Sequence, residues 1–438
     1  MWTIHAAADA IRRRELSPVT LLDECLARID CHESKVRAWV FVAREEARAQ
    51  AERLAQELKN GQCRGSLHGI PIGVKDIFDV FDWPTAAGSK LWVNSIARRD
   101  CPVVERLRQA GAIIVGKTVT TAYASFDPPP TRNPWNAART PGGSSSGSAA
   151  AVACGMCLGA LASQTGGSIT RPAAFCGVSS VKPTYGRVSA EGVVPLAPSM
   201  DHVGVMANCI RDVAILLGAI GDSFPTFSVP SAMTEPEQPP CLGRLGGLFA
   251  ERAEPVMRSA FIAAMRKLEA AGATLLDLDP PAGFCEVLQR HQTVMAVEAA
   301  EVHELRIRRH AEDYPPRITS LIEEGFRTSA TEYVRCLHHK DTLTDALVEQ
   351  LELSEAHAFV TPAALGPAPS AETTGNPAFN SPWSYTGLPV VSLPIGWTED
   401  GLPLSLQLTG DRFREEDLLR WASWCERVVD FERRELHD

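Results

Sequence analysis

The sequence lacks any long apolar run. Its longest stretch of apolar and small residues, 149–162, contains two glycines and is too short to cross a bilayer, which takes about 20 residues. The first residues, MWTIHAAADAIRRREL, carry charge from Asp9 onward and lack the apolar core of a signal peptide. We therefore expect a cytoplasmic chain with no membrane partner.

Positive charge is also in short supply. The chain has 43 lysines and arginines against 53 aspartates and glutamates, which gives a formal net charge of −10. Binding to nucleic acids or to anionic membranes depends on clustered positive charge. No nucleic-acid partner is therefore expected.

The sequence patterns that hold disulfides or metals are missing as well. Twelve cysteines are scattered without a regular spacing, which is typical of free thiols. Cys154 and Cys157 form a CxxC, but no second pair accompanies it. His303 and Glu304 are followed by His310, too far along the chain for two ligands on one helical turn. We expect no metal and no cofactor.

What the sequence does contain is an alternation of strand-like and helix-like segments. Apolar runs over 38–42, 69–76 and 112–118 predict strands, and the segment 102–110 between two of them predicts a helix. Short connections between such elements are typical of an α/β fold with helices packed on the faces of a sheet.

Two halves can be distinguished along the chain. A proline-rich stretch, 223–240, separates them, but 388–397 again has the composition of a core strand, so we interpret the chain as a single domain. Within it we expect an N-terminal helical region (1–64), a core (65–220), and a helical insertion followed by C-terminal sheet strands (241–438).

A glycine-rich loop supplies a candidate nucleophile. The segment SQTGGSITRPAAFCG (163–177) places Ser168 directly after two glycines, whose backbone freedom allows the loop to present amide groups. A serine hydroxyl is a weak nucleophile until a base removes its proton. The sequence must therefore supply a base.

One possible base is the histidine of a Ser-His-Asp triad. The chain contains one GxSxG string, Gly143 to Gly147, which would make Ser145 the nucleophile. That motif requires a strand directly before it, and Pro141 in the preceding ARTPG disfavours one.

A second possible base is a lysine. Lys75 lies within the apolar segment GIPIGVKD, and burial there would lower its pKa from the ordinary value of about 10.4. The alternative interpretation is a strand-end lysine that forms an ion pair with Asp76.

Several segments together resemble the amidase signature family. They are GIPIGVKD (69–76), PGGSSSGSAAAVA (141–153), SQTGGSITRPAAFCGV (163–178), KPTYGRVS (182–189) and TGLPVVSLPIGWTEDGLPLSLQLTG (386–410). The resemblance extends from about residue 65 to near the C-terminus. It implies a single large α/β domain with a twisted mixed β-sheet covered by helices on both faces.

The resemblance also implies a Ser-Ser-Lys triad without histidine. Carried over to this sequence, Ser168 is the nucleophile, Lys75 is the base, and Ser144 bridges them after a cis peptide bond. Ser145 corresponds to a supporting serine. The residues whose backbone amides would form the oxyanion hole are Thr165, Gly166, Gly167 and Ser168.

Three positions depart from the family pattern. Gln164 stands where many members have aspartate, and Ser146 stands where glycine is usual. Thr170-Arg171 replaces the frequent arginine two residues after the nucleophile. These departures leave the triad in place and weaken inference about the charge of the substrate.

Within the family, the sequence looks most similar to bacterial amidases of the aryl acylamidase and urethanase type, which act on small-molecule amides and carbamates. The alternatives are the glutaminase subunit of a tRNA-dependent amidotransferase and a non-catalytic docking module on the same fold. We consider a homodimer as the assembly.

Two loops are expected to border the substrate. They are 126–143, which leads into Ser144, and 376–387. An aromatic pocket would favour aryl groups, although the same side chains could pack the loops onto the core instead. The candidate substrate-binding residues are Phe126, Trp135, Phe379, Trp383 and Tyr385.

Overall fold

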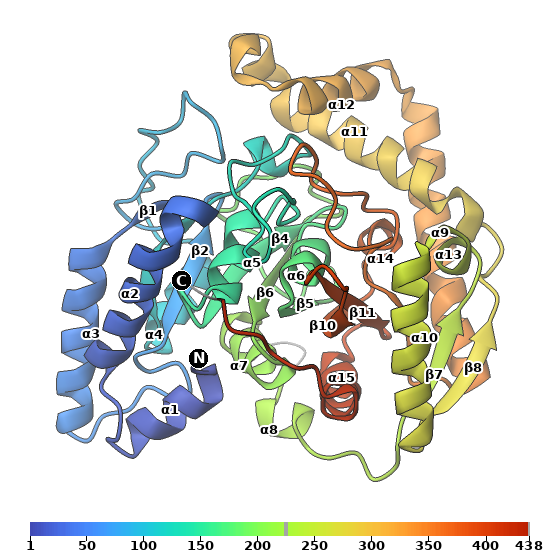
Figure 1. Cartoon of the computed structure of the whole chain (residues 1–438). Helices are drawn as coiled ribbons and strands as arrows, with labels where there is room; N and C mark the ends of the chain where they lie inside the picture. Colours follow the sequence, from blue (N-terminus) through green and yellow to red (C-terminus); the bar gives the residue numbers. More distant parts are fainter. Residues whose placement is uncertain (223–226, 437–438) are drawn as a thin grey trace.

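The computed structural model describes residues 1–222 and 227–436, and one 11-stranded sheet runs through both halves of the chain (Figure 1). In the order of their hydrogen-bonded neighbours the strands are β1 (Trp39–Val42), β3 (Ile113–Thr118), β2 (Pro71–Lys75), β4 (Gly159–Gln164), β6 (His202–Ala207), β5 (Ser179–Lys182), β10 (Val390–Trp397), β11 (Pro403–Thr409), β9 (Ala358–Pro362), β7 (Cys241–Leu245) and β8 (Thr274–Leu278).

The sheet is mixed, as predicted. Strand β2 runs parallel to both β3 and β4, and β7 runs parallel to β8 and β9. Antiparallel pairs link these two parallel groups through β6, β5, β10 and β11. All residues of β2, β3 and β4 are buried, which is typical of strands covered on both faces.

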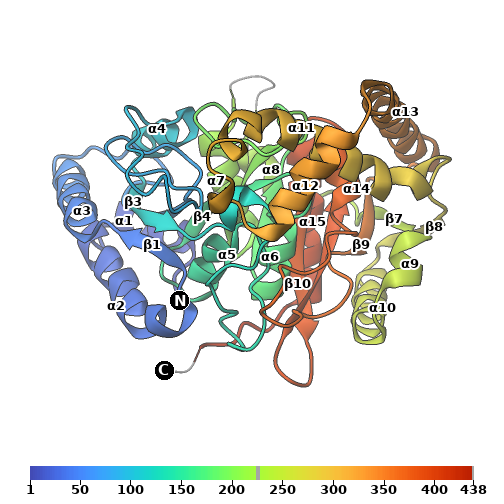
Figure 2. The same ribbon diagram turned by 90° about the horizontal axis from the view of Figure 1, so that it is seen from above.

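Helices cover both faces of the sheet (Figure 2). Helices α5 and α6 pack against each other and the middle strands, whereas α7 and α15 form a separate layer. The helices are α1 (Ile4–Arg12), α2 (Pro18–Val36), α3 (Arg44–Lys59), α4 (Pro102–Gln109), α5 (Ser146–Ala153), α6 (Thr170–Cys176), α7 (Ile210–Ile220), α8 (Val229–Ala232), α9 (Leu248–Arg252), α10 (Pro255–Ala270), α11 (Val287–Ile307), α12 (Pro316–Arg327), α13 (Ala330–Ser354), α14 (Ser381–Tyr385) and α15 (Glu415–Val429), with 3₁₀ turns η1 (Ala122–Ala124), η2 (Phe284–Glu286) and η3 (Ala311–Asp313).

The α/β single-domain fold is therefore confirmed, and most predicted elements lie within a few residues of their expected bounds. Helix α2 continues as far as Val36, which is still buried, and it ends where Arg37 adopts a left-handed conformation with φ of 55°. Of the proline-rich stretch 223–240, residues 223–226 lie outside the described part of the chain.

The second half contributes a group of helices, α11 to α14. Helix α11 packs against α12, α13 and α14, and it lies toward the loops that follow β4 (Figure 1). Through His291 on α11 this group contacts the loop that carries Ser168. No helix of the described chain combines the length and the apolar character needed to cross a membrane.

Candidate active site

Lys75 occupies the carboxyl end of β2, beside the carboxyl end of the parallel strand β4. The side chain of Lys75 is fully buried. Its Nζ lies 2.8 Å from Ser144 Oγ and 2.8 Å from Ser163 Oγ. Burial lowers the pKa of Lys75 to about 7, against the opposing attraction of the Asp201 carboxylate. A lysine with this pKa is substantially neutral at physiological pH and can act as a base.

The neighbouring carboxylate of Asp76 does not pair with Lys75. Successive side chains along a strand point to opposite faces, so Asp76 lies on the other face from Lys75. There it forms a buried ion pair with Lys117 Nζ at 2.8 Å. The structure therefore contradicts the alternative interpretation, in which Lys75 forms an ion pair with Asp76.

Ser144 is held by contacts to the backbone on either side of it. The Gly143–Ser144 peptide bond is cis, the one such bond in the described chain. Arg171 Nη2 donates to the Gly143 carbonyl at 2.7 Å, and the Thr121 amide donates to the Ser144 carbonyl at 3.3 Å. These contacts fix the backbone at the point where the hydroxyl of Ser144 meets Lys75.

Ser168 lies in the short loop between β4 and α6 and is 7% exposed. Its hydroxyl forms no hydrogen bond within the described chain, either with Ser144 or with another residue. Hydrogen bonds between catalytic groups are often long before substrate binds. The backbone amides of Gly166, Gly167 and Ser168 also have no partner among the described residues, so all three can donate to a bound group.

The Thr165 carbonyl in this loop, in contrast, has a hydrogen-bond partner. His291 on α11 donates from Nε2 to the Thr165 carbonyl at 3.0 Å. The Thr165 hydroxyl donates to Asp201 at 2.5 Å, and burial lowers the pKa of His291 to about 4. With this pKa His291 is neutral at physiological pH. Its Nε2 carries the hydrogen, because the carbonyl that it contacts can only accept.

Ser163 and Ser145 connect the lysine to the GxSxG segment. Ser145 is fully buried, and its hydroxyl donates to the Ser163 carbonyl at 3.2 Å and accepts from the Ser163 amide at 3.3 Å. The Ser163 hydroxyl in turn accepts a hydrogen bond from Lys75 Nζ. No histidine bonds to Ser145 within the described residues.

Sequence reasoning did not identify Ser163, Asp201 or His291 as parts of the site. Ser163 had a usable signal, since it lies one residue before the end of the strand next to Lys75 and opens the glycine-rich segment. His291 and Asp201 had none, because each reaches Thr165 from a distant part of the sequence.

Comparison with known proteins bears on the assignment of this site. The family model described as Amidase matches residues 20–419. The chain is 33% identical to AmiD of Mycobacterium tuberculosis, a protein named as an amidase, over 98% of this chain and 94% of that protein. The chain belongs to the amidase family. As a member of it, this protein is a hydrolase of C–N bonds in amides.

Two further similarities cover nearly the whole of this amidase. The glutamyl-tRNA(Gln) amidotransferase of Syntrophus aciditrophicus has a subunit that is 31% identical over 99% of this chain and 98% of its own length. The solved structure of native peptide amidase from Stenotrophomonas maltophilia superimposes with a TM-score of 0.88 at 26% identity, over 99% of this chain and 98% of that one. These relatives differ in the reaction that their names describe, so likeness alone does not select a substrate.

Three of the predicted substrate-binding aromatics lie in the core. Phe379, Trp383 and Tyr385 are all fully buried. The ring of Trp383 stacks on Phe249 with centroids 5.7 Å apart, and the Tyr385 hydroxyl donates to the Cys336 carbonyl at 2.5 Å. Both contacts are with other residues of the second half of the chain. Helix α14, which carries Trp383 and Tyr385, also carries Ser384, whose hydroxyl donates to the Gly166 carbonyl in the loop before Ser168.

The other two aromatics lie along the loop 126–143. The Phe126 carbonyl accepts from Arg317 Nη1 at 3.1 Å, which ties the loop to α12. Trp135 donates from Nε1 to the Cys176 carbonyl at 2.8 Å, and its ring packs edge-on against Trp397. Trp135 also lines a cavity of about 180 Å³ together with residues near both chain termini. Each of these contacts is with another part of the chain, and the role of the five aromatics in substrate binding stays a prediction.

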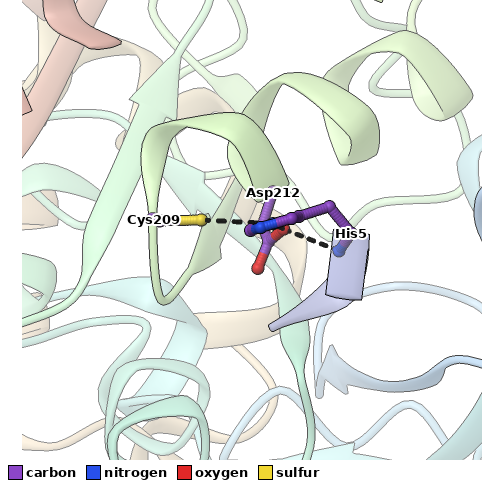
Figure 3. Close-up of side chains that lie close together, drawn as sticks. All are labelled: His5, Cys209 and Asp212. Atoms are coloured by element: carbon purple, nitrogen blue, oxygen red, sulfur yellow. Dashed lines mark hydrogen bonds and ion pairs between the residues drawn. The ribbon is translucent and has the colours of Figure 1, made fainter. Parts of the chain in front are cut away.

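One group of side chains in the described structure has the composition of a metal site: His5, Cys209 and Asp212 (Figure 3). Both oxygens of Asp212 are already occupied, because they accept from the amides of Ile4 and His5 at 2.7 and 2.9 Å. His5 Nδ1 also lies 2.8 Å from Asp212, and Cys209 Sγ is 3.8 Å from the same nitrogen. We interpret this group as an anchor for the start of α1.

Proposed function

We propose that this chain is a serine amidohydrolase that works through an acyl-enzyme, with Ser168 as nucleophile and Lys75, acting through Ser144, as base. The observation that carries the proposal is the fully buried Lys75 Nζ at 2.8 Å from Ser144 Oγ. A neutral amine in that position can accept the proton that Ser144 passes on from Ser168.

The reaction then proceeds in two halves. Ser168 loses its proton to Ser144 as Ser144 gives its own to Lys75, and Ser168 Oγ bonds to the acyl carbon. The developing oxyanion accepts from the backbone amides of Thr165, Gly166, Gly167 and Ser168. The proton returns along the relay to the leaving nitrogen as the C–N bond breaks, and water releases the acyl group by the same path. With a carbamate, an alcohol or an amine leaves instead.

The substrates that we propose are aryl amides and aryl carbamates rather than free glutamine. The carboxylate that bonds to the nucleophile loop is already committed, because Asp201 accepts from Thr165, Leu196 and Ala197. Arg171 bonds to Gly143 through Nη2, and its Nε and Nη1 have no partner among the described residues, but its side chain is only 1% exposed. The ammonium of glutamine would therefore lose its hydration without a free carboxylate to pair with.

The test is a comparison of kcat/KM for nitroacetanilide, an aryl carbamate and glutamine with the purified chain. We expect release of the aryl amine to be faster than release of ammonia from glutamine, because an aryl ring gains about 25 cal/mol for each Å² removed from water. Faster ammonia release would contradict this substrate class.

That opposite result would favour the second candidate, the glutaminase subunit of an amidotransferase. Its support is the 31% identity to the Syntrophus aciditrophicus amidotransferase protein over nearly all of both chains. A non-catalytic docking module on the same fold is distinguished by the same assay, since it would hydrolyse none of the three compounds.

A further inference from the structure

The chain that follows β3 runs beside the segment that contains Ser144. The Thr121 amide donates to the Ser144 carbonyl at 3.3 Å, and the Val119 carbonyl accepts from the Gly147 amide at 3.0 Å. The Thr121 hydroxyl donates to the Ser125 carbonyl at 2.7 Å, which closes the turn that contains η1. The position of this turn therefore decides where the Thr121 amide meets Ser144.

Two consecutive residues of this turn have strained backbones. Tyr123 has a φ of 51° and Ala124 has a φ of 58°, and neither is glycine. In this left-handed region the Cβ of an L residue lies too close to the following carbonyl oxygen, so such residues persist only where other contacts hold them. Strain of this kind is concentrated at functional sites. The turn must therefore be held by the structure around it.

The contacts that hold the turn are made by the side chain of Tyr123. It is fully buried, and its ring stacks on Tyr314 with centroids 4.6 Å apart. Its hydroxyl donates to the carboxylate of Asp313 in η3. The same carboxylate accepts from the Ser89 hydroxyl at 2.5 Å and from the Lys90 amide at 3.0 Å. Asp313 thus ties both the turn and the loop at Ser89 to η3.

The protonation states of Tyr123 and Asp313 give their hydrogen bond one direction. Burial and the hydrogen bond to Asp313 raise the pKa of Tyr123 well above its ordinary value. Burial alone would raise the pKa of Asp313, but hydrogen bonds from Ser89 and Tyr123 lower it below its ordinary value. At neutral pH Tyr123 is therefore the donor and Asp313 is an ionised acceptor, and a hydrogen bond to an ionised group is stronger than one between neutral groups.

We propose that Tyr123 and Asp313 are positioning residues for Ser144. Their hydrogen bond holds the strained turn, and the turn holds the Ser144 carbonyl through the Thr121 amide. This inference rests on the proposed function, in which Ser144 relays the proton. If the turn relaxes, the Ser144 carbonyl loses a donor and the Ser144 hydroxyl loses its alignment with Lys75. Small misplacements of reacting groups cost large factors in rate.

The first experiment is Tyr123→Phe, which removes the hydroxyl and keeps the buried ring. We expect kcat on nitroacetanilide to fall by about 10-fold with little change in KM, because the proton relay is misaligned while the substrate contacts stay in place. The matched control is Tyr333→Phe on α13, which removes another tyrosine hydroxyl that donates to a carboxylate, that of Glu298 at 2.9 Å. We expect the control to keep the wild-type kcat.

The strain in the turn supplies a test that a merely structural role would not pass. Glycine adopts the left-handed region without a steric penalty, so Ala124→Gly should let the turn keep its shape without the hydrogen bond. Adding Ala124→Gly to Tyr123→Phe is expected to restore kcat to within about threefold of wild type, and Ala124→Gly alone should leave kcat unchanged.

A second variant tests the other partner of the hydrogen bond. Asp313→Asn leaves one acceptor oxygen for three donors, so it should lower kcat as Tyr123→Phe does. Because both changes break the same hydrogen bond, the double variant should lose no more than the more damaging single change.

Three results would overturn the inference while the proposed function stands. They are wild-type kcat in Tyr123→Phe, a loss that Ala124→Gly does not reverse, and an equal loss in Tyr333→Phe. A wild-type chain that hydrolyses no amide would overturn the proposed function and the inference with it. If Tyr123→Phe does not fold, Asp313→Asn decides alone and together with Ala124→Gly, with wild-type kcat or a missing rescue as the contradicting result.

Discussion

Replacement of Ser168 by alanine is expected to abolish hydrolysis, with a loss in kcat/KM on the order of 10⁴-fold or more. The variant removes the atom that bonds to the acyl carbon. It should fold normally, because the Ser168 hydroxyl forms no hydrogen bond within the described structure. Steady-state kinetics and the thermal unfolding midpoint, Tm, measured together, separate the loss of chemistry from a loss of folding.

Ser145→Ala is the control for this experiment. Ser145 supports the Ser163 backbone and does not contact Lys75, so its loss should slow the reaction without stopping it. A serine-hydrolase inactivator such as a fluorophosphonate should be found on Ser168 by peptide mass spectrometry. An adduct on Ser145 with Ser168 unmodified would reverse the assignment and revive the GxSxG interpretation.

Replacement of Lys75 by methionine is expected to lower the rate of acylation at pH 7 by about 10³-fold. Methionine fills a similar volume in the buried site but cannot accept the proton from Ser144. The loss should appear in kcat, because substrate contacts are unchanged, and stopped-flow detection of the first product released measures it directly.

Lys182→Met is the matched control, since Lys182 is also fully buried at a strand end but bonds to the Pro183 carbonyl. We expect it to keep acylation within a few fold of wild type. Near-normal acylation by Lys75→Met at pH 7 would rule out the relay, whatever the control does.

The three residues predicted as a triad lie in sequence segments with recognisable patterns, and the structure brings two of them, Lys75 and Ser144, into contact. Lys75 was marked by its place in an apolar strand, and strand alternation explains why Asp76 faces away from it. Ser168 and Ser144 lie in short segments rich in glycine and serine. Local pattern pointed to Lys75 and Ser168, whose strands β2 and β4 run parallel and end side by side, whereas Ser144 followed from the resemblance to the amidase signature family.

The supporting contacts depended on the tertiary structure. His291 bonds to Thr165 across 126 positions of the sequence, and Ser384 bonds to Gly166 across 218. Nothing in the sequence near either residue indicates its partner. The aromatic residues illustrate the same limit: Trp383 lies in a segment that we expected beside the substrate, but its ring stacks on Phe249 from α9. Its role in substrate binding stays a prediction.

The pH dependence of Ser168 modification by a fluorophosphonate tests the central claim most directly. Only the neutral form of Lys75 can accept a proton, and its pKa lies at about 7. The account predicts a second-order rate constant that rises about tenfold per pH unit below pH 7 and levels off above it in the wild type, and that loses this titration in Lys75→Met. A rate that is flat from pH 5.5 to 8.5, or the same titration in both proteins, would contradict it.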